Sequence, residues 1–158
     1  MYTTDLDRTG RIWLGPEETP NQVCLLRKRF DLSAASRSAI LHLFADTTYH
    51  LWCNGTLVGR GPTFFHPHRR PVDRYDLSPY VQTGPNVLAV QVHSAGIAQH
   101  NHIPAGTPGL VARCVVENDI GASDLFISDS TWKASLESGW QADTPRRSWA
   151  IGFVEHFD

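Results

Sequence analysis

Apolar residues recur at every second position along most of the chain, and this period restricts the fold more than any other feature. Five runs are rich in Val, Leu, Ile and aromatic residues and are separated by Gly, Pro, Asn and Asp: 23–30, 38–45, 49–54, 86–93 and 110–117. Such runs are typical of half-buried β-strands. No segment carries the i, i+3, i+4, i+7 stripe of an amphipathic helix, and 33–37 is long enough only for a loop or one helical turn. We therefore predict an all-β protein of two packed antiparallel sheets.

The length of the chain suits one domain. With 158 residues, of which 41% are apolar, it can bury roughly 70% of its unfolded surface without help from disulfides or metal. We expect a single domain over 1–158, in which 1–22 can be an irregular N-terminal extension. The three cysteines, Cys24, Cys53 and Cys114, are an odd number and lie inside apolar runs, which predicts buried free thiols.

Charge and hydropathy exclude two classes of partner. The net charge is −2, and the 14 basic residues are dispersed along the chain, so neither nucleic acid nor an anionic membrane is an expected partner. No apolar run approaches the roughly 20 residues of a membrane span, and the polar first ten residues do not resemble a signal peptide. We expect a cytoplasmic location.

One turn and the direction of the strands organise the predicted site. Asn54-Gly55 supplies the two positive φ angles of a type I′ turn, which predicts a tight hairpin. We also expect short strands at 57–60 and 73–76. If the strands at 38–45, 49–54, 57–60, 73–76 and 86–93 alternate in direction, the turn at 46–48 and the long connections 61–72 and 94–108 leave the sandwich at the same end, here called the loop end. Its side chains combine aromatic rings with planar hydrogen-bonding groups, as sugar recognition requires. The predicted sugar-binding residues at this end are Asp46, Phe64, Phe65, His66, His68, Arg69, His100, Asn101 and His102.

Trp52 is a separate candidate for sugar binding. Cys53 shares its side of the strand with Tyr49 and Leu51, so Cys53 points inward and Trp52 points outward. An outward Trp52 is either a platform on which a sugar stacks or a residue covered by a neighbouring domain.

The sequence offers no catalytic constellation. A glycosidase needs two carboxyl groups across a cleft, whereas Asp73 with Asp76, and Glu155 with Asp158, are more simply turn carboxylates. No G-x-S-x-G elbow is present. The pairs His66-x-His68 and His100-x-His102 could jointly hold zinc or copper, but no HExxH or CxxC motif supports a metal. We predict no catalytic residue and no metal site, and we favour hydrogen bonding to sugar for these histidines.

Several motifs in order resemble the N-terminal β-sandwich domains of bacterial α-L-rhamnosidases, glycoside hydrolase family 78. They are Ala45-Asp46-x-x-Tyr49-x-Leu51-Trp52-x-Asn54-Gly55-x-x-Val58-Gly59-x-Gly61-Pro62, Tyr75-Asp76-Leu77-x-Pro79-Tyr80, Gly84-x-Asn86-Val87-Leu88-Ala89-Val90 and Trp149-Ala150-x-Gly152-Phe153-x-Glu155-x-Phe157-Asp158. The resemblance implies a galactose-binding-like jelly-roll sandwich that accompanies a separate catalytic barrel. It also allows a truncated or split gene. Relatives that bind rhamnose use calcium, but here the strand ending at His93 is followed by Ser94-Ala95-Gly96-Ile97, so no motif supports calcium and no cofactor is expected.

The sequence therefore predicts a non-catalytic accessory or carbohydrate-binding domain. Its expected partners are a carbohydrate containing rhamnose or galactose and either the catalytic domain of a glycosidase or a second copy of the chain. The alternative is a structural module that joins domains or forms a dimer without binding sugar.

Overall fold

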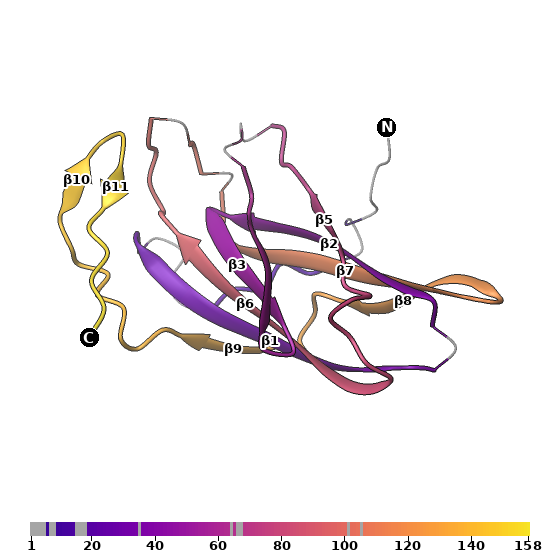
Figure 1. Ribbon diagram of the computed structural model, residues 1–158. Coiled ribbons are helices and arrows are strands. Elements are labelled where there is room, and N and C mark those ends of the chain that lie inside the picture. The colour runs from indigo at the N-terminus through magenta and orange to yellow at the C-terminus, as the bar shows by residue number, and fades with distance from the viewer. Residues whose placement is uncertain are drawn as a thin grey trace.

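Two antiparallel sheets pack face to face in the computed structural model of the chain (Figure 1). The structure describes residues 6, 9–14, 19–34, 36–63, 65, 68–100, 102–104 and 106–158. None of these residues is helical, so none forms a helix that could cross a membrane. The all-β sandwich predicted from the sequence is confirmed, and it is consistent with a galactose-binding-like jelly roll.

The first sheet has five strands in the order β4-β3-β6-β1-β9. Their bounds are Gln22–Leu32 for β1, Thr48–Cys53 for β3, Thr56–Gly61 for β4, Gly84–Ser94 for β6 and Lys133–Leu136 for β9. Strands β1 and β6 form the centre of this sheet and pair along their whole lengths, from Gln22 opposite Ser94 to Leu32 opposite Gly84.

The second sheet has four strands in the order β5-β2-β7-β8. Their bounds are Ser38–Asp46 for β2, Asp73–Asp76 for β5, Gly109–Asn118 for β7 and Gly121–Ile127 for β8. A separate hairpin near the C-terminus joins β10 (Arg146–Ser148) to β11 (Gly152–Phe153). The predicted strands are confirmed to within two residues. Strands β8 to β11 were not predicted because they are short or mostly exposed and lack a clear alternation.

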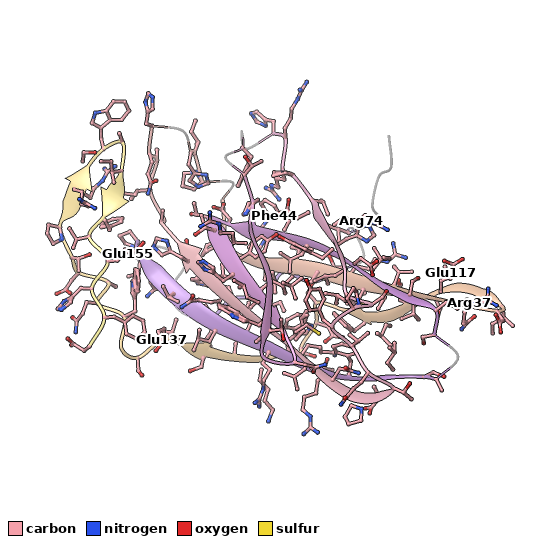
Figure 2. All side chains as sticks on the ribbon, viewed as in Figure 1. Arg37, Phe44, Arg74, Glu117, Glu137 and Glu155 are labelled. Carbon is pink, nitrogen blue, oxygen red and sulfur yellow. The ribbon has the colours of Figure 1, made fainter. Side chains whose placement is uncertain are left out.

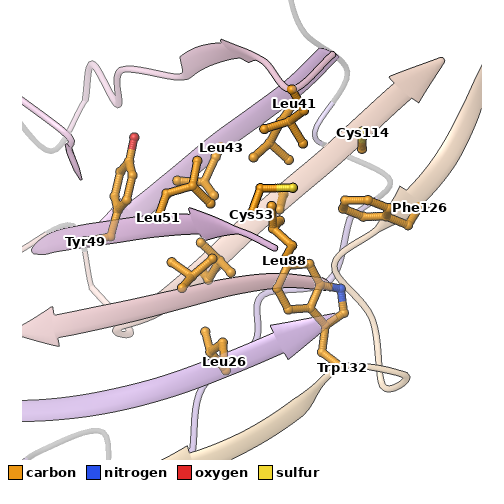
Figure 3. Close-up of a cluster of buried hydrophobic side chains, with 14 of the residues drawn as sticks. Leu26, Leu41, Leu43, Tyr49, Leu51, Cys53, Leu88, Cys114, Phe126 and Trp132 are labelled. Atoms are coloured by element: carbon orange, nitrogen blue, oxygen red, sulfur yellow. The ribbon is translucent and has the colours of Figure 1, made fainter. Parts of the chain in front are cut away.

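The core fills the space between the sheets with side chains from alternate positions of each strand (Figure 3). Leu26, Leu51 and Leu88 from the first sheet meet Leu41 and Leu43 from the second, and all are buried. The three cysteines lie in the same cluster as buried free thiols, as predicted. Burial raises the pKa of the Cys53 thiol to about 11 and that of Cys114 to about 12, so both remain protonated.

A polar network closes the end of the sandwich opposite the loop end. Asn54 and Gly55 have φ angles of 50° and 82°, which confirms the predicted tight turn. The Asn54 side chain donates to Asn86 Oδ1 at 2.8 Å and accepts from the Val87 N–H at 2.9 Å. Asn86 is buried and donates to the carbonyls of Gln82 and Gly84. The two asparagines therefore tie the β3–β4 hairpin to the start of β6.

A second network joins the two sheets at their open edge. The Tyr49 hydroxyl on β3 donates to Asp73 Oδ2 on β5 at 2.5 Å and lies 2.8 Å from the Tyr75 hydroxyl. Burial, followed by the hydrogen bond to Asp73, raises the pKa of Tyr49. A Cβ at Gly61 would lie 2.5 Å from Asp73 Oδ2, so glycine permits this close approach.

We predict that Asn86→Asp lowers the free energy of unfolding by about 3 kcal/mol, because a carboxylate cannot donate to two carbonyls and is buried beside them. Asn118→Asp is the matched control, since Asn118 only accepts a hydrogen bond, from the Ile120 N–H, and aspartate does the same. Urea unfolding measures both variants. Equal, small effects at the two positions would show that the Asn86 donations contribute little.

Candidate functional site

The strand pairings place the predicted connections together at the loop end. Asp46 pairs with Gly109, Thr48 with His93, and Tyr49 with Gly61. The turn after β2 and the connections 61–72 and 94–108 therefore leave the sandwich on the same side, at the top of the view in Figure 1. Phe44 lies toward this end of β2, and Arg37 lies at the opposite end (Figure 2).

Three of the predicted residues form a buried cluster at the loop end. Asp46 and His102 are each 2% exposed, and Asp46 Oδ1 lies 3.2 Å from His102 Nε2. The His102 ring packs edge-on against half-buried Phe65 at 5.1 Å, and Phe65 packs against Phe44 at 5.2 Å. Asp46 and His102 contact these neighbours rather than solvent, and half-buried Phe65 packs beside them. The three side chains therefore hold the two long connections against the end of β2.

Other predicted residues at the loop end are exposed. His68, Arg69 and His100 all face solvent. The His100 ring meets the indole of Trp149 edge-on at 4.8 Å, and Trp149 is 64% exposed. The β10–β11 hairpin therefore lies beside the 94–108 connection, a neighbourhood that the sequence did not predict. Phe64, His66 and Asn101 lie outside the described residues.

Trp52 lies on a different surface from the loop-end residues. As predicted, Cys53 is buried and Trp52 points away from the core, where it is half-buried. It lines a groove of about 530 Å³ on the outer face of the five-stranded sheet, which we call the outer groove. The lining residues are Leu25, Leu26, Arg27, Trp52, Ala89, Val90, Gln91, Lys133, Ala134 and Ser135.

Two rows of outward side chains cross the outer groove. Trp52 pairs with Ala89, Ala89 with Arg27, and Arg27 with Lys133, which sets one row across four strands. Neighbouring strands lie about 4.8 Å apart, so Trp52 and Arg27 flank Ala89 at a spacing that accommodates a pyranose ring. A short side chain between two long ones makes the hollow.

The second row runs parallel to the first, and each of its residues is two positions from a first-row residue on the same strand. His50 pairs with Gln91, Gln91 with Leu25, and Leu25 with Ser135. The His50 and Trp52 rings lie 5.8 Å apart. Gln91 and Ser135 therefore add hydrogen-bonding groups beside the first row. The sequence analysis did not name His50 or Gln91 as binding residues, although their alternation with buried Leu51 and Val92 indicates that both point outward.

A smaller cavity of about 110 Å³ continues the outer face toward the loop end. It shares His50 and Gln91 with the second row and is otherwise lined by Val23, Thr48, His93, Trp140 and Glu155. Glu155 comes from the C-terminal segment, which lies beside the start of β1 (Figure 2).

His93 helps to fasten the C-terminal segment onto this sheet. Its Nε2 lies 2.9 Å from Asn21 Oδ1, and Asn21 also donates to the carbonyl of Ala142. The Trp140 indole donates to the Asn21 carbonyl at 2.7 Å and packs 5.3 Å from the His93 ring. Burial lowers the pKa of His93, and the charge of Glu155 opposes this in part.

Among the described residues, no group of three or more His, Cys, Asp or Glu side chains is arranged to hold a metal ion. Calcium therefore stays what the resemblance alone implies.

Comparison with known proteins supports the resemblance stated from the motifs. No protein-family model matches the chain. An α-L-rhamnosidase of Formosa agariphila is 27% identical over 122 residues, which are 71% of this chain and 13% of that protein. The crystal structure of a GH78 family rhamnosidase of Bacillus sp. GL1 is 33% identical, with a TM-score of 0.86 over 96% of this chain. The match spans 16% of that rhamnosidase, so the similarity concerns a small part of a much longer protein.

A likeness of fold extends to a lectin. The lectin from Pleurotus ostreatus, solved in complex with GalNAc, has a TM-score of 0.59 and 17% identity over 95% of this chain and 43% of its own. The similarity to GH78 rhamnosidases is thus confirmed in sequence and structure, and the lectin shares the sandwich fold.

We predict that His102→Ala lowers the free energy of unfolding by about 3 kcal/mol, because it removes a buried ring and leaves a cavity beside the buried Asp46 and Phe65 side chains. His100→Ala is the control, since His100 is exposed and should cost under about 0.5 kcal/mol. Chemical denaturation of both variants measures the difference. A small, equal loss would contradict a structural role for the Asp46–His102 pair.

We predict that stability falls as the pH drops through about 6.5, the ordinary pKa of histidine, in part because of His93. Folded His93 stays neutral while unfolded His93 takes up a proton, so acid favours the unfolded chain. Measured between pH 7.5 and 5.0, the free energy of unfolding should depend less on pH in His93→Gln than in the wild type. His50→Gln, at an exposed position, serves as the control, and an unchanged slope in His93→Gln would refute the assignment.

Proposed function

We propose that this chain is a non-catalytic carbohydrate-binding domain of a rhamnosidase-like protein and that a saccharide binds in the outer groove against Trp52. One observation carries the proposal. A half-exposed indole stands beside Ala89 in a groove of about 530 Å³ whose walls also present Gln91, Arg27 and Ser135.

The chemistry of the outer groove suits a sugar ring. The C–H face of a pyranose packs on an aromatic surface, while its hydroxyl groups need donors and acceptors in fixed positions. Trp52, Ala89 and Gln91 all lie on paired strands, whose backbone positions are set by the sheet. A site on strands is held more precisely than one on connections.

The comparisons support this proposal in two ways. The matched parts are only 13% and 16% of the two rhamnosidases, which favours an accessory role over catalysis for this chain. The lectin of similar fold was solved with GalNAc, which supports a carbohydrate as the class of ligand. We propose a rhamnose- or galactose-containing carbohydrate as the ligand here and a glycosidase catalytic domain as the natural neighbour.

A second candidate function is a module that packs on another domain or on a second copy of the chain. The observation that favours it is the apolar character of the same face, where Leu25 is 36% exposed and Leu57, paired with Trp52, is 55% exposed. Exposed apolar surface of this kind is found at protein–protein contacts as well as at ligand sites.

We predict that Trp52→Ala weakens saccharide binding about tenfold or more, because a stacked aromatic ring contributes about 1 kcal/mol or more beyond its hydrophobic area. Calorimetric titration with L-rhamnose, galactose and plant oligosaccharides measures the affinity. Trp149→Ala is the matched control, since it removes an exposed tryptophan from the loop end and should leave binding in the outer groove unchanged.

The two candidate functions give different results in the same experiment. Binding that is lost in Trp52→Ala and kept in Trp149→Ala supports the carbohydrate site. No binding by the wild type, together with a concentration-dependent dimer in light scattering that Trp52→Ala dissociates, supports the second candidate. Binding lost only in Trp149→Ala would move the site to the loop end and refute the outer groove.

A further inference from the structure

Two cations stand side by side at the outer groove. Arg27 on β1 and Lys133 on β9 are direct cross-strand partners. Partners in register point to the same face of a sheet, and both residues line the groove. They continue the row that begins with Trp52 and Ala89.

The surroundings of this pair lack negative charge. The groove lining contains Arg27 and Lys133 but no Asp or Glu, whereas the whole chain carries 16 acidic and 14 basic residues. Within the described part of the chain, neither cation has a carboxylate oxygen within 4.0 Å.

Other cations on nearby strands are treated differently. Lys28, next to Arg27 in the sequence, points to the other side and lies 3.8 Å from Asp129. Arg113 on β7 contacts Asp124 at 2.6 Å. Lys28 and Arg113 thus each have an acidic partner, whereas Arg27 and Lys133 face each other across two paired strands.

Like charges placed directly across two strands repel, and an anion between them relieves that repulsion. An arginine can bind a carboxylate or sulfate through two parallel hydrogen bonds, and a lysine adds a compact charge beside it. We propose, as an extension of the carbohydrate-binding function of this same groove, that its ligand is a negatively charged saccharide. The sugar ring lies over Ala89 against Trp52, and its acidic group points to Arg27 and Lys133.

This arrangement follows the spacing of the row. In an acidic sugar the charged substituent lies beside the ring. In the groove, Arg27 lies on the strand next to Ala89, so a ring above Ala89 places its charged substituent at Arg27. A uronic acid carboxylate and a sulfate ester both fit this chemistry, and the experiment below separates them. Ala89→Leu fills the hollow between Trp52 and Arg27, so it should abolish binding of either ligand.

The test is calorimetric titration of the full chain with three matched probes in 20 mM and 200 mM salt. The probes are trigalacturonate, the same trisaccharide with its carboxyl groups reduced to alcohols, and a sulfated galactose trisaccharide. We expect at least one anionic probe to bind tenfold or more tightly than the reduced one, with the advantage shrinking at high salt because screening weakens exposed charge interactions.

Variants locate the effect. Arg27→Gln and Lys133→Gln should each remove most of the anionic advantage, whereas Arg147→Gln, the same charge change on an exposed residue of β10, should leave it intact. Thermal unfolding of each variant checks that the fold is kept.

The outcomes separate this inference from the function on which it rests. Preference for trigalacturonate assigns a uronic acid, and preference for the sulfated probe assigns a sulfate ester. Equal binding of all three probes, lost in Trp52→Ala, overturns the anionic ligand and leaves carbohydrate binding standing. An anionic advantage that survives in both glutamine variants also overturns the assignment. Failure of every probe to bind overturns both proposals.

Discussion

The packing of the two sheets on a shared apolar core determines the rest of this structure. Strands β1 and β6 pair over their whole lengths, so each residue that one strand sends inward has a neighbour sent inward by the other. Leu26 and Val90, for example, are partners and both are buried. Because side chains alternate, the same pairing sends Arg27 and Ala89 outward. A one-residue shift in the register of a strand would expose its core residues and bury its groove residues. The register that fixes the core therefore also fixes the outer groove.

Polar networks fasten the ends of the sandwich, where the apolar core stops. At one end Asn54 and Asn86 join the hairpin to β6, and at the loop end Asp46 lies 3.2 Å from His102 of the 94–108 connection. All but His102 belong to the motifs that resemble the rhamnosidases. Much of that resemblance therefore reflects folding. Arg27 and Lys133 lie outside the quoted motifs, and in the proposal above they give the outer groove its preference for an anionic ligand.

The loop end and the outer groove divide the candidate residues between two tasks. At the loop end, the side chains of Asp46, Phe65 and His102 contact one another and Phe44, so their role is structural. On the outer face, Trp52 and Gln91 stand on rigid strands with their polar or aromatic groups turned to a hollow. A groove on a sheet can accept a chain of sugars lengthwise, which suits the carbohydrate-binding role proposed above.

Local sequence determined the main strands and the position of the Asn54-Gly55 turn. It also determined that the cysteines are buried and that Trp52 points outward. These features follow from alternation and turn chemistry, which act between residues close in the sequence. The sequence also predicted that the turn at 46–48 and the connections 61–72 and 94–108 lie at one end, since strands that alternate in direction return to the same side. The order of strands in the sheets did not follow, because it depends on pairing between segments far apart in the chain. Only the tertiary structure set Trp52, Ala89, Arg27 and Lys133 in one row and buried His102 against Asp46, since cross-strand neighbours and burial are fixed by packing and not by position in the sequence.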